Sequence, residues 1–172
     1  MKLALLGDIH GNHFALEAVL VAARKHAVER LLVAGDLVGY YFWPKEVLEL
    51  LASWSSVMVR GNHEDMLAAA RSDPAFLARV DERYGTGLRC VIEQLDELQL
   101  DQLCALPHPL ELVIDGCRIL LCHGAPWDVD HYVYPDAKPE LLARCAEQEF
   151  DLVVLGHTHY PMRHQIGKTL VV

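Results

Sequence analysis

The chain has 172 residues, of which 52% are hydrophobic and 23% are charged. This composition is typical of a globular protein and excludes a disordered, collagen-like or low-complexity chain. Twenty-four acidic residues against fifteen basic ones give a net charge of −9 at pH 7, and a surface of that sign argues against a nucleic-acid partner.

Short apolar runs alternate along the chain with segments of helical periodicity. In chain order, the pattern predicts a strand at 3–6, a helix capped by Asn12, a strand at 31–34, a helix from Pro44, a strand at 57–59, helices over 64–106 broken at Gly85 and Gly87, strands at 110–114 and 118–122 around an Asp115-Gly116 turn, a loop over 124–139, a helix at 140–147, a strand at 152–155 and a hairpin over 163–172. This alternation predicts an α/β fold in which helices pack on the faces of sheets. The length fits one domain over residues 1–172.

The chain shows no feature of a membrane or secreted protein. No apolar run approaches the roughly 20 residues that a bilayer span needs. The five cysteines are odd in number and form no C-x-x-C pair, which is typical of reduced thiols. We therefore expect a cytoplasmic protein without a membrane partner.

Side chains that can bind metal follow five of the predicted strands directly. The five stretches are Gly7-Asp8-Ile9-His10, Gly35-Asp36, Gly61-Asn62-His63, Cys122-His123-Gly124 and Gly156-His157-Thr158-His159. Ligands collect at the carboxyl ends of strands in α/β sheets, so five strand ends at one rim would bring these side chains together. In extended backbone, residues i and i+2 point the same way. We therefore expect Asp8 and His10 to face one ion, and His157 and His159 to do likewise.

The donor types predict transition metals and a phosphorylated ligand. Imidazole, carboxylate and amide ligands without thiolate favour Mn, Fe, Zn, Co or Ni over Ca. If Asp36 bridges, the set suffices for two ions about 3.5–4 Å apart. Their charge outweighs that of Asp8 and Asp36, so the site would attract a phosphate ester despite the acidic surface. Taken singly, Asp8 is explained as a turn former and Asn62 as a helix cap. The occurrence of five such stretches in one chain is not explained in this way.

The five stretches, in this order and across nearly the whole chain, resemble the motifs of the calcineurin-like metallophosphoesterases. The length and the Gly156–His159 stretch most resemble the small bacterial and archaeal phosphodiesterase branch of that family. The resemblance implies a layered β-sandwich flanked by α-helices. It also implies a role for each side chain: Asp8, His10 and His159 hold a first metal, Asn62, His123 and His157 hold a second, and Asp36 bridges both. His63 either protonates the leaving oxygen as a general acid or steadies the transition state. Small members of the family usually continue beyond the point that matches Val172, so a short C-terminal segment is expected to be missing here.

We therefore predict an enzyme that hydrolyses phosphodiester or phosphomonoester bonds of a small phosphorylated molecule by metal-activated hydroxide. Two divalent ions would serve as cofactors, with manganese expected first and iron, zinc, nickel or cobalt as alternatives. Arg60 is a second predicted catalytic residue, because arginine can clamp two phosphate oxygens. The stretch around it also resembles the Ser/Thr protein phosphatases, but the aspartate that orients the catalytic histidine in those enzymes is replaced here by Gly39.

Several alternatives stay open at this point. A chain of this fold can serve as a metal-binding interaction scaffold, as the retromer scaffold subunit does, and a protein phosphatase or a dinucleoside polyphosphate hydrolase is a further reading. The aromatic run 40–43 is either a wall of the substrate site or a packed loop or subunit contact, which leaves a homo-oligomer open. Trp127, Tyr132 and Tyr134 are either a substrate lid or part of a packed loop.

Overall fold

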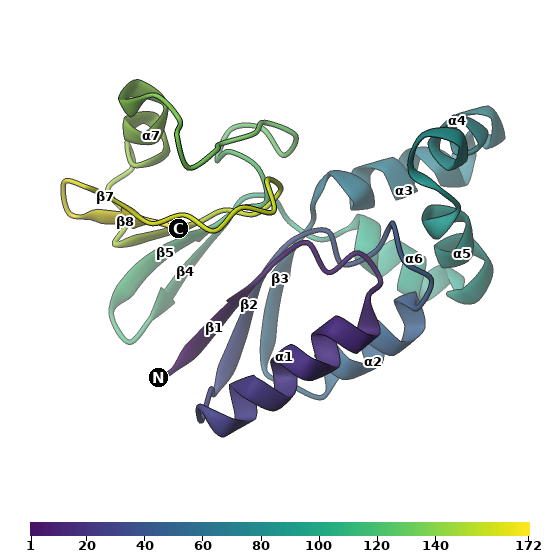
Figure 1. Cartoon of the computed structure of the whole chain (residues 1–172), viewed down its shortest axis with the longest axis horizontal. Helices are drawn as coiled ribbons and strands as arrows, with labels where there is room; N and C mark the ends of the chain where they lie inside the picture. Colours follow the sequence, from purple (N-terminus) through teal and green to yellow (C-terminus); the bar gives the residue numbers. More distant parts are fainter.

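The computed structural model describes residues 1–172 and contains two β-sheets that pack against each other, with helices outside them (Figure 1). In chain order the elements are β1 (Leu3–Leu6), α1 (His13–Lys25), β2 (Arg30–Ala34), α2 (Pro44–Ala52), β3 (Ser56–Val59), α3 (Asn62–Ser72), α4 (Pro74–Tyr84), α5 (Gly87–Gln94), α6 (Glu97–Cys104), β4 (Leu110–Ile114), β5 (Cys117–Leu121), α7 (Pro139–Cys145), β6 (Leu152–Val154), β7 (His164–Ile166) and β8 (Thr169–Val171). The first sheet is parallel, in the order β1-β2-β3. The second is mixed, in the order β4-β5-β6-β8-β7.

Strand β2 shows how the layers are held together. Its side chains alternate, as the pleat of a strand requires. Leu31 and Val33 enter a core shared with the helices, whereas Leu32 and Ala34 enter a core shared with the second sheet. With both faces buried, this central parallel strand is a continuous apolar run. The second sheet buries its outer face under α7 and the loop that precedes it.

The predicted elements are confirmed, with small shifts at their ends. The side chain of Asn12 accepts a hydrogen bond from Ala15 N at 3.1 Å and caps α1. The predicted helical middle consists of four helices, and Gly85, with a φ of 82°, ends α4. Asp115 and Gly116 both have positive φ, as the tight turn between β4 and β5 requires. No helix combines the length and the apolar character that a membrane crossing needs.

Candidate metal centre

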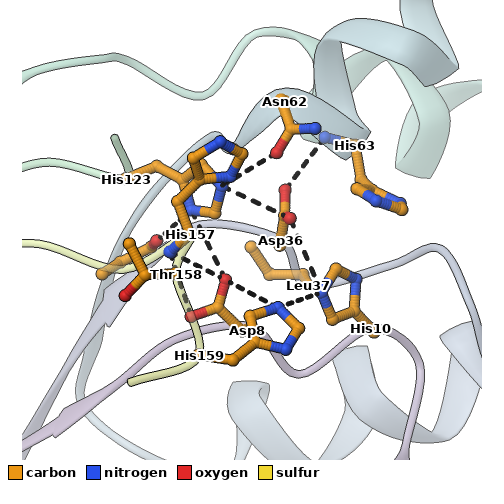
Figure 2. Close-up of polar contacts among 12 residues, drawn as sticks. Asp8, His10, Asp36, Leu37, Asn62, His63, His123, His157, Thr158 and His159 are labelled. Carbon is orange, nitrogen blue, oxygen red and sulfur yellow. Dashed lines mark hydrogen bonds and ion pairs between the residues drawn. The ribbon is translucent and has the colours of Figure 1, made fainter. Parts of the chain in front are cut away.

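Seven side chains from five strand ends converge where the two sheets meet (Figure 2). Each comes from the segment that directly follows a strand: Asp8 and His10 after β1, Asp36 after β2, Asn62 after β3, His123 after β5, and His157 and His159 after β6. The strands of the first sheet are parallel to one another, and β5 is parallel to β6, so each set presents its carboxyl ends at a single edge. The expected convergence of the strand ends is therefore present.

The first set of donors, the Asp8 group, consists of Asp8, His10 and His159. One ligand atom of each lies within 4.8 Å of the other two. His159 Nε2 lies 3.1 Å from His10 Nε2 and 3.5 Å from Asp8 Oδ1. Three donors from two strand ends therefore surround one small volume.

The second set, the Asp36 group, consists of Asp36, Asn62, His123 and His157. His123 Nε2 lies 3.0 Å from Asn62 Oδ1, 3.1 Å from His157 Nδ1 and 3.3 Å from Asp36 Oδ2. The same Asp36 oxygen lies 3.6 Å from His10 Nε2. Asp36, which is 2% exposed, therefore stands between the two groups.

The donor set fits metal cations. Three of the rings donate a proton away from the centre: His10 Nδ1–H to Val38 O, His123 Nδ1–H to Ala34 O, and His157 Nε2–H to Asp130 O. Such hydrogen bonds orient metal-binding imidazoles and leave the opposite nitrogen free to coordinate. His123 Nε2 then faces three acceptor atoms, and a single proton on it satisfies only one of them. A cation in this place satisfies all of them.

The ionisable groups at the centre shift one another's pKa values. Burial by itself raises the pKa of Asp36, but the hydrogen bond and charge of His123, together with His63 and His10, outweigh it and lower that pKa to about 2. Burial lowers the pKa of His123, but Asp36 outweighs it and raises that pKa to about 9. Burial also lowers the pKa of His10 to about 4, so that ring is neutral at pH 7. A cation that binds here takes the place of the His123 proton.

The backbone at the strand ends differs from the predicted extended geometry. Five of the seven residues, namely Asp8, His10, Asp36, His157 and His159, have φ between 50° and 69°. This left-handed conformation costs roughly 1–2 kcal/mol per residue and is typical of functional sites. The expectation that His157 and His159 face one ion was therefore wrong. The turn sends His159 into the Asp8 group and His157 into the Asp36 group.

Glu64 is a residue of this site to which the sequence analysis assigned no role. Its buried carboxylate accepts four backbone N–H groups, from Asp36 at 3.0 Å, Leu37 at 2.9 Å, Val38 at 3.2 Å and Gly61 at 2.7 Å. Burial, and then the charge of Asp36, raises the pKa of Glu64 to about 7. Glu64 thus joins the start of α3 to the loop that carries Asp36. Its place three residues after Gly61, where a capping box has its acid, is a signal that could have indicated the hydrogen bond from Gly61.

His63 is held through its backbone by Asp36, whose Oδ1 accepts its N–H at 2.9 Å, and through its side chain by neighbouring rings. Its imidazole packs against His10 at 4.6 Å, Tyr40 at 4.8 Å and Tyr84 at 6.1 Å, measured between ring centroids. Its Nδ1 is buried without a hydrogen-bond partner. A Cβ built on Gly39 would lie 2.1 Å from that nitrogen, so no side chain fits at Gly39 while His63 keeps this position.

The guanidinium of Arg60 is engaged with the helical segment. Its Nε donates to Asp65 Oδ1 at 2.7 Å, and its Nη1 donates to Leu106 O at 3.1 Å. Its predicted contact with a phosphate stays a prediction. A second arginine that the sequence analysis did not single out, Arg83, stacks on Tyr84 at 5.0 Å, beside His63.

Tyrosines flank the centre on two sides. Tyr40 stands edge-on to His10, with ring centroids 4.5 Å apart. Tyr132 lies 3.8 Å from the ring of His157 and stacks on Tyr134 at 5.6 Å. The loop before α2 and the loop before α7 thus each place a partly exposed tyrosine ring against a candidate metal-binding histidine. Trp43, in contrast, packs against Phe14 of α1 at 4.9 Å, so the aromatic run 40–43 is only partly available to a substrate.

Comparisons with known proteins bear on the family and the fold of the chain. A model of the calcineurin-like phosphoesterase family matches residues 1–161. An uncharacterized protein of Methanocaldococcus jannaschii is 28% identical over 162 residues, which cover 92% of this chain and 63% of that protein. The crystal structure of a metallophosphoesterase from Sphaerobacter thermophilus is 29% identical and has a TM-score of 0.68, over 96% of this chain and 63% of that one. The crystal structure of a hypothetical protein from Pyrococcus horikoshii has a TM-score of 0.85 over 98% of this chain and 74% of that one, and its 22% identity makes this a likeness of fold alone. The chain spans less than two thirds of the Methanocaldococcus and Sphaerobacter proteins.

Proposed function

The chain belongs to the calcineurin-like phosphoesterase family, and on that premise we propose that it hydrolyses phosphodiesters of a small molecule at a centre of two divalent metal ions. The observation that carries this proposal is the convergence of seven side chains with nitrogen or oxygen donors, of which the buried Asp36 stands between the other six. One oxygen of Asp36 lies within 3.6 Å of a ring nitrogen in each group, at His10 and at His123.

The Asp8 group would hold one ion and the Asp36 group the other, with Asp36 shared between them. When bound, two such ions supply Lewis-acid charge for the phosphoryl oxygens and lower the pKa of a water molecule. Manganese is our first choice among the metals that imidazole and carboxylate donors suit, followed by iron, zinc, nickel and cobalt. The donor set excludes thiolate, since no cysteine lies among the clustered ligands.

The side chains of the protein would position the metal-binding imidazoles and transfer a proton to the leaving oxygen. The carbonyls of Ala34, Val38 and Asp130 hold three imidazoles with one nitrogen facing the centre. His63 would give a proton to the leaving oxygen through Nε2, because Nδ1 is buried against Gly39. General acid catalysis of this kind contributes typically 10²–10⁴-fold.

A diester is preferred over a monoester because of what surrounds the centre. Tyr40 lies on the His10 side and Tyr132 on the His157 side, so an organic group can pack on either flank. The protein phosphatase alternative is disfavoured by Gly39, whose neighbourhood leaves no space for an orienting aspartate.

The test is a reconstitution experiment. Metal-free protein is loaded separately with each of the five metals and assayed with bis(p-nitrophenyl) phosphate and with p-nitrophenyl phosphate. We expect metal-dependent hydrolysis, with the diester favoured. The absence of turnover with every metal, in a protein that still binds two ions, would instead support the scaffold alternative.

Asp36→Asn tests the shared ligand directly. Loss of the bridging carboxylate is expected to reduce the content of both metals, as measured by elemental analysis. The matched control is Asp65→Asn, because Asp65 is exposed on α3 and pairs only with Arg60. Two ions per chain in the Asp36→Asn protein would contradict the assignment.

A further inference from the structure

Beside the Asp8 group, on the flank that carries Tyr40, lies a hollow of about 490 Å³ whose occupant the proposed reaction does not specify. The three members of that group line it, together with Val19 of α1 and Tyr40 and Tyr41 of the loop before α2. A volume of this size is within the range of small-molecule sites, about 300–1,000 Å³. The hollow is therefore continuous with the place where a phosphoryl group would bind.

The charge of the hollow restricts what can enter it. Its lining contains no lysine or arginine, and Asp8 is the only carboxylate in it. A second phosphate group would meet no cationic side chain there, so a polyphosphate chain is disfavoured on this side. An uncharged organic group fits better, because most of the remaining lining is apolar.

The walls of the hollow are both solvent-exposed and fixed in position. Val19 is 43% exposed and Tyr41 is 46% exposed, so a ligand would remove apolar surface from water. The ring of Tyr40 stands edge-on to His10 at 4.5 Å. The backbone N–H of Tyr41 donates to His10 O at 2.8 Å, which ties the aromatic run 40–43 to the segment that carries Asp8 and His10.

We propose that this hollow is a specificity pocket for an uncharged aromatic ring attached to the phosphorus group that the metals hold. This inference rests on the proposed function, which places the phosphorus group at the centre. An aromatic ring is favoured over an alkyl chain because two tyrosines, Tyr40 and Tyr41, are among the residues that line the hollow, and paired rings gain free energy beyond simple burial. This pocket disfavours a polyphosphate chain, and it therefore disfavours the alternative of a dinucleoside polyphosphate hydrolase.

The test measures binding directly, with two probes that differ only in their organic group. Calorimetry of the metal-loaded protein gives the dissociation constants of phenylphosphonate and methylphosphonate. Burial of the ring is expected to make phenylphosphonate bind about tenfold more tightly or better. Val19→Trp fills the hollow and should remove this preference while leaving the affinity for methylphosphonate unchanged.

The chain offers a matched control in Val21→Trp. Val21 is on the same helix and is 44% exposed, but it does not line the hollow, so its exchange should leave both affinities unchanged. Tyr41→Ala is a second variant that removes a wall instead of filling the space. Tyr41→Ala should weaken the binding of phenylphosphonate and leave the binding of methylphosphonate unchanged.

Two results would overturn the pocket. One is equal affinity of the wild-type protein for the two phosphonates, and the other is an unchanged preference in both Val19→Trp and Tyr41→Ala. Hydrolysis of bis(p-nitrophenyl) phosphate by the same wild-type preparation separates the two hypotheses. If hydrolysis occurs without a phenyl preference, the pocket alone is wrong. If the protein neither hydrolyses the diester nor binds either phosphonate, the proposed function fails and the pocket fails with it.

Discussion

Glu64→Gln is expected to destabilise the metal-free protein by roughly 2–4 kcal/mol, because it removes an acceptor from a cluster of backbone donors. The carboxylate accepts the N–H groups of Asp36 and Gly61 through one oxygen and those of Leu37 and Val38 through the other. A glutamine presents an NH₂ group to one of these pairs and leaves two buried donors unpaired.

The magnitude follows from two opposing effects. Two unpaired donors at about 1–3 kcal/mol each give roughly 2–6 kcal/mol. Burial raises the pKa of Glu64 to about 7, so its ionised form costs the fold free energy that the neutral glutamine recovers. The lower part of the range therefore applies. With a urea slope of about 2–3 kcal/mol per M, the midpoint of unfolding should fall by roughly 1 M.

The assay is urea unfolding followed by circular dichroism, in the presence of a chelator and at pH 8, where Glu64 is ionised. Glu97→Gln is the matched control, because the side chain of Glu97 is 84% exposed and pairs with Arg71 at 2.6 Å. An exposed pair contributes typically 0.2–1 kcal/mol. A midpoint for Glu64→Gln that falls no further than that of Glu97→Gln would refute the role of Glu64 in holding the Asp36 loop.

Three further results are expected. His63→Ala should keep its metal content by elemental analysis and lose about 10²–10⁴-fold in kcat, and full activity would remove His63 from the mechanism. Gly39→Ala should be less stable to urea than Gly116→Ala, because both glycines have positive φ but only the Cβ at Gly39 meets an imidazole, and equal midpoints would contradict this clash. Removal of metal by a chelator should lower the melting temperature, because ions bind the folded chain and hold together donors that otherwise repel, and an unchanged value would argue against a metal centre.

The elements of this fold could be predicted from the sequence because their signals are local. The cap at Asn12, the helix start at Pro44 and the tight turn at Asp115-Gly116 each depend on a few neighbouring residues. The convergence of the strand ends could be predicted for a related reason, since parallel strands present their carboxyl ends at one edge.

The details of the centre could not be predicted in the same way, because they depend on atoms from segments far apart in the chain. An alternating pattern suggested extended backbone at the strand ends, and the structure has left-handed turns that separate His157 from His159. The hydrogen bonds of Glu64 to the Asp36 loop cross 26 to 28 residues, and no local pattern shows them.

The amino-acid sequence by itself therefore determined the α/β architecture, the family and the set of donor side chains, because strand periodicity, turn residues and motif order are written along the chain. Only the tertiary structure decided that the backbone at the strand ends is left-handed, that His63 packs among rings beside Gly39, and that a hollow opens beside Tyr40. These features depend on distances of a few ångströms between segments that the chain brings together only when both sheets are packed.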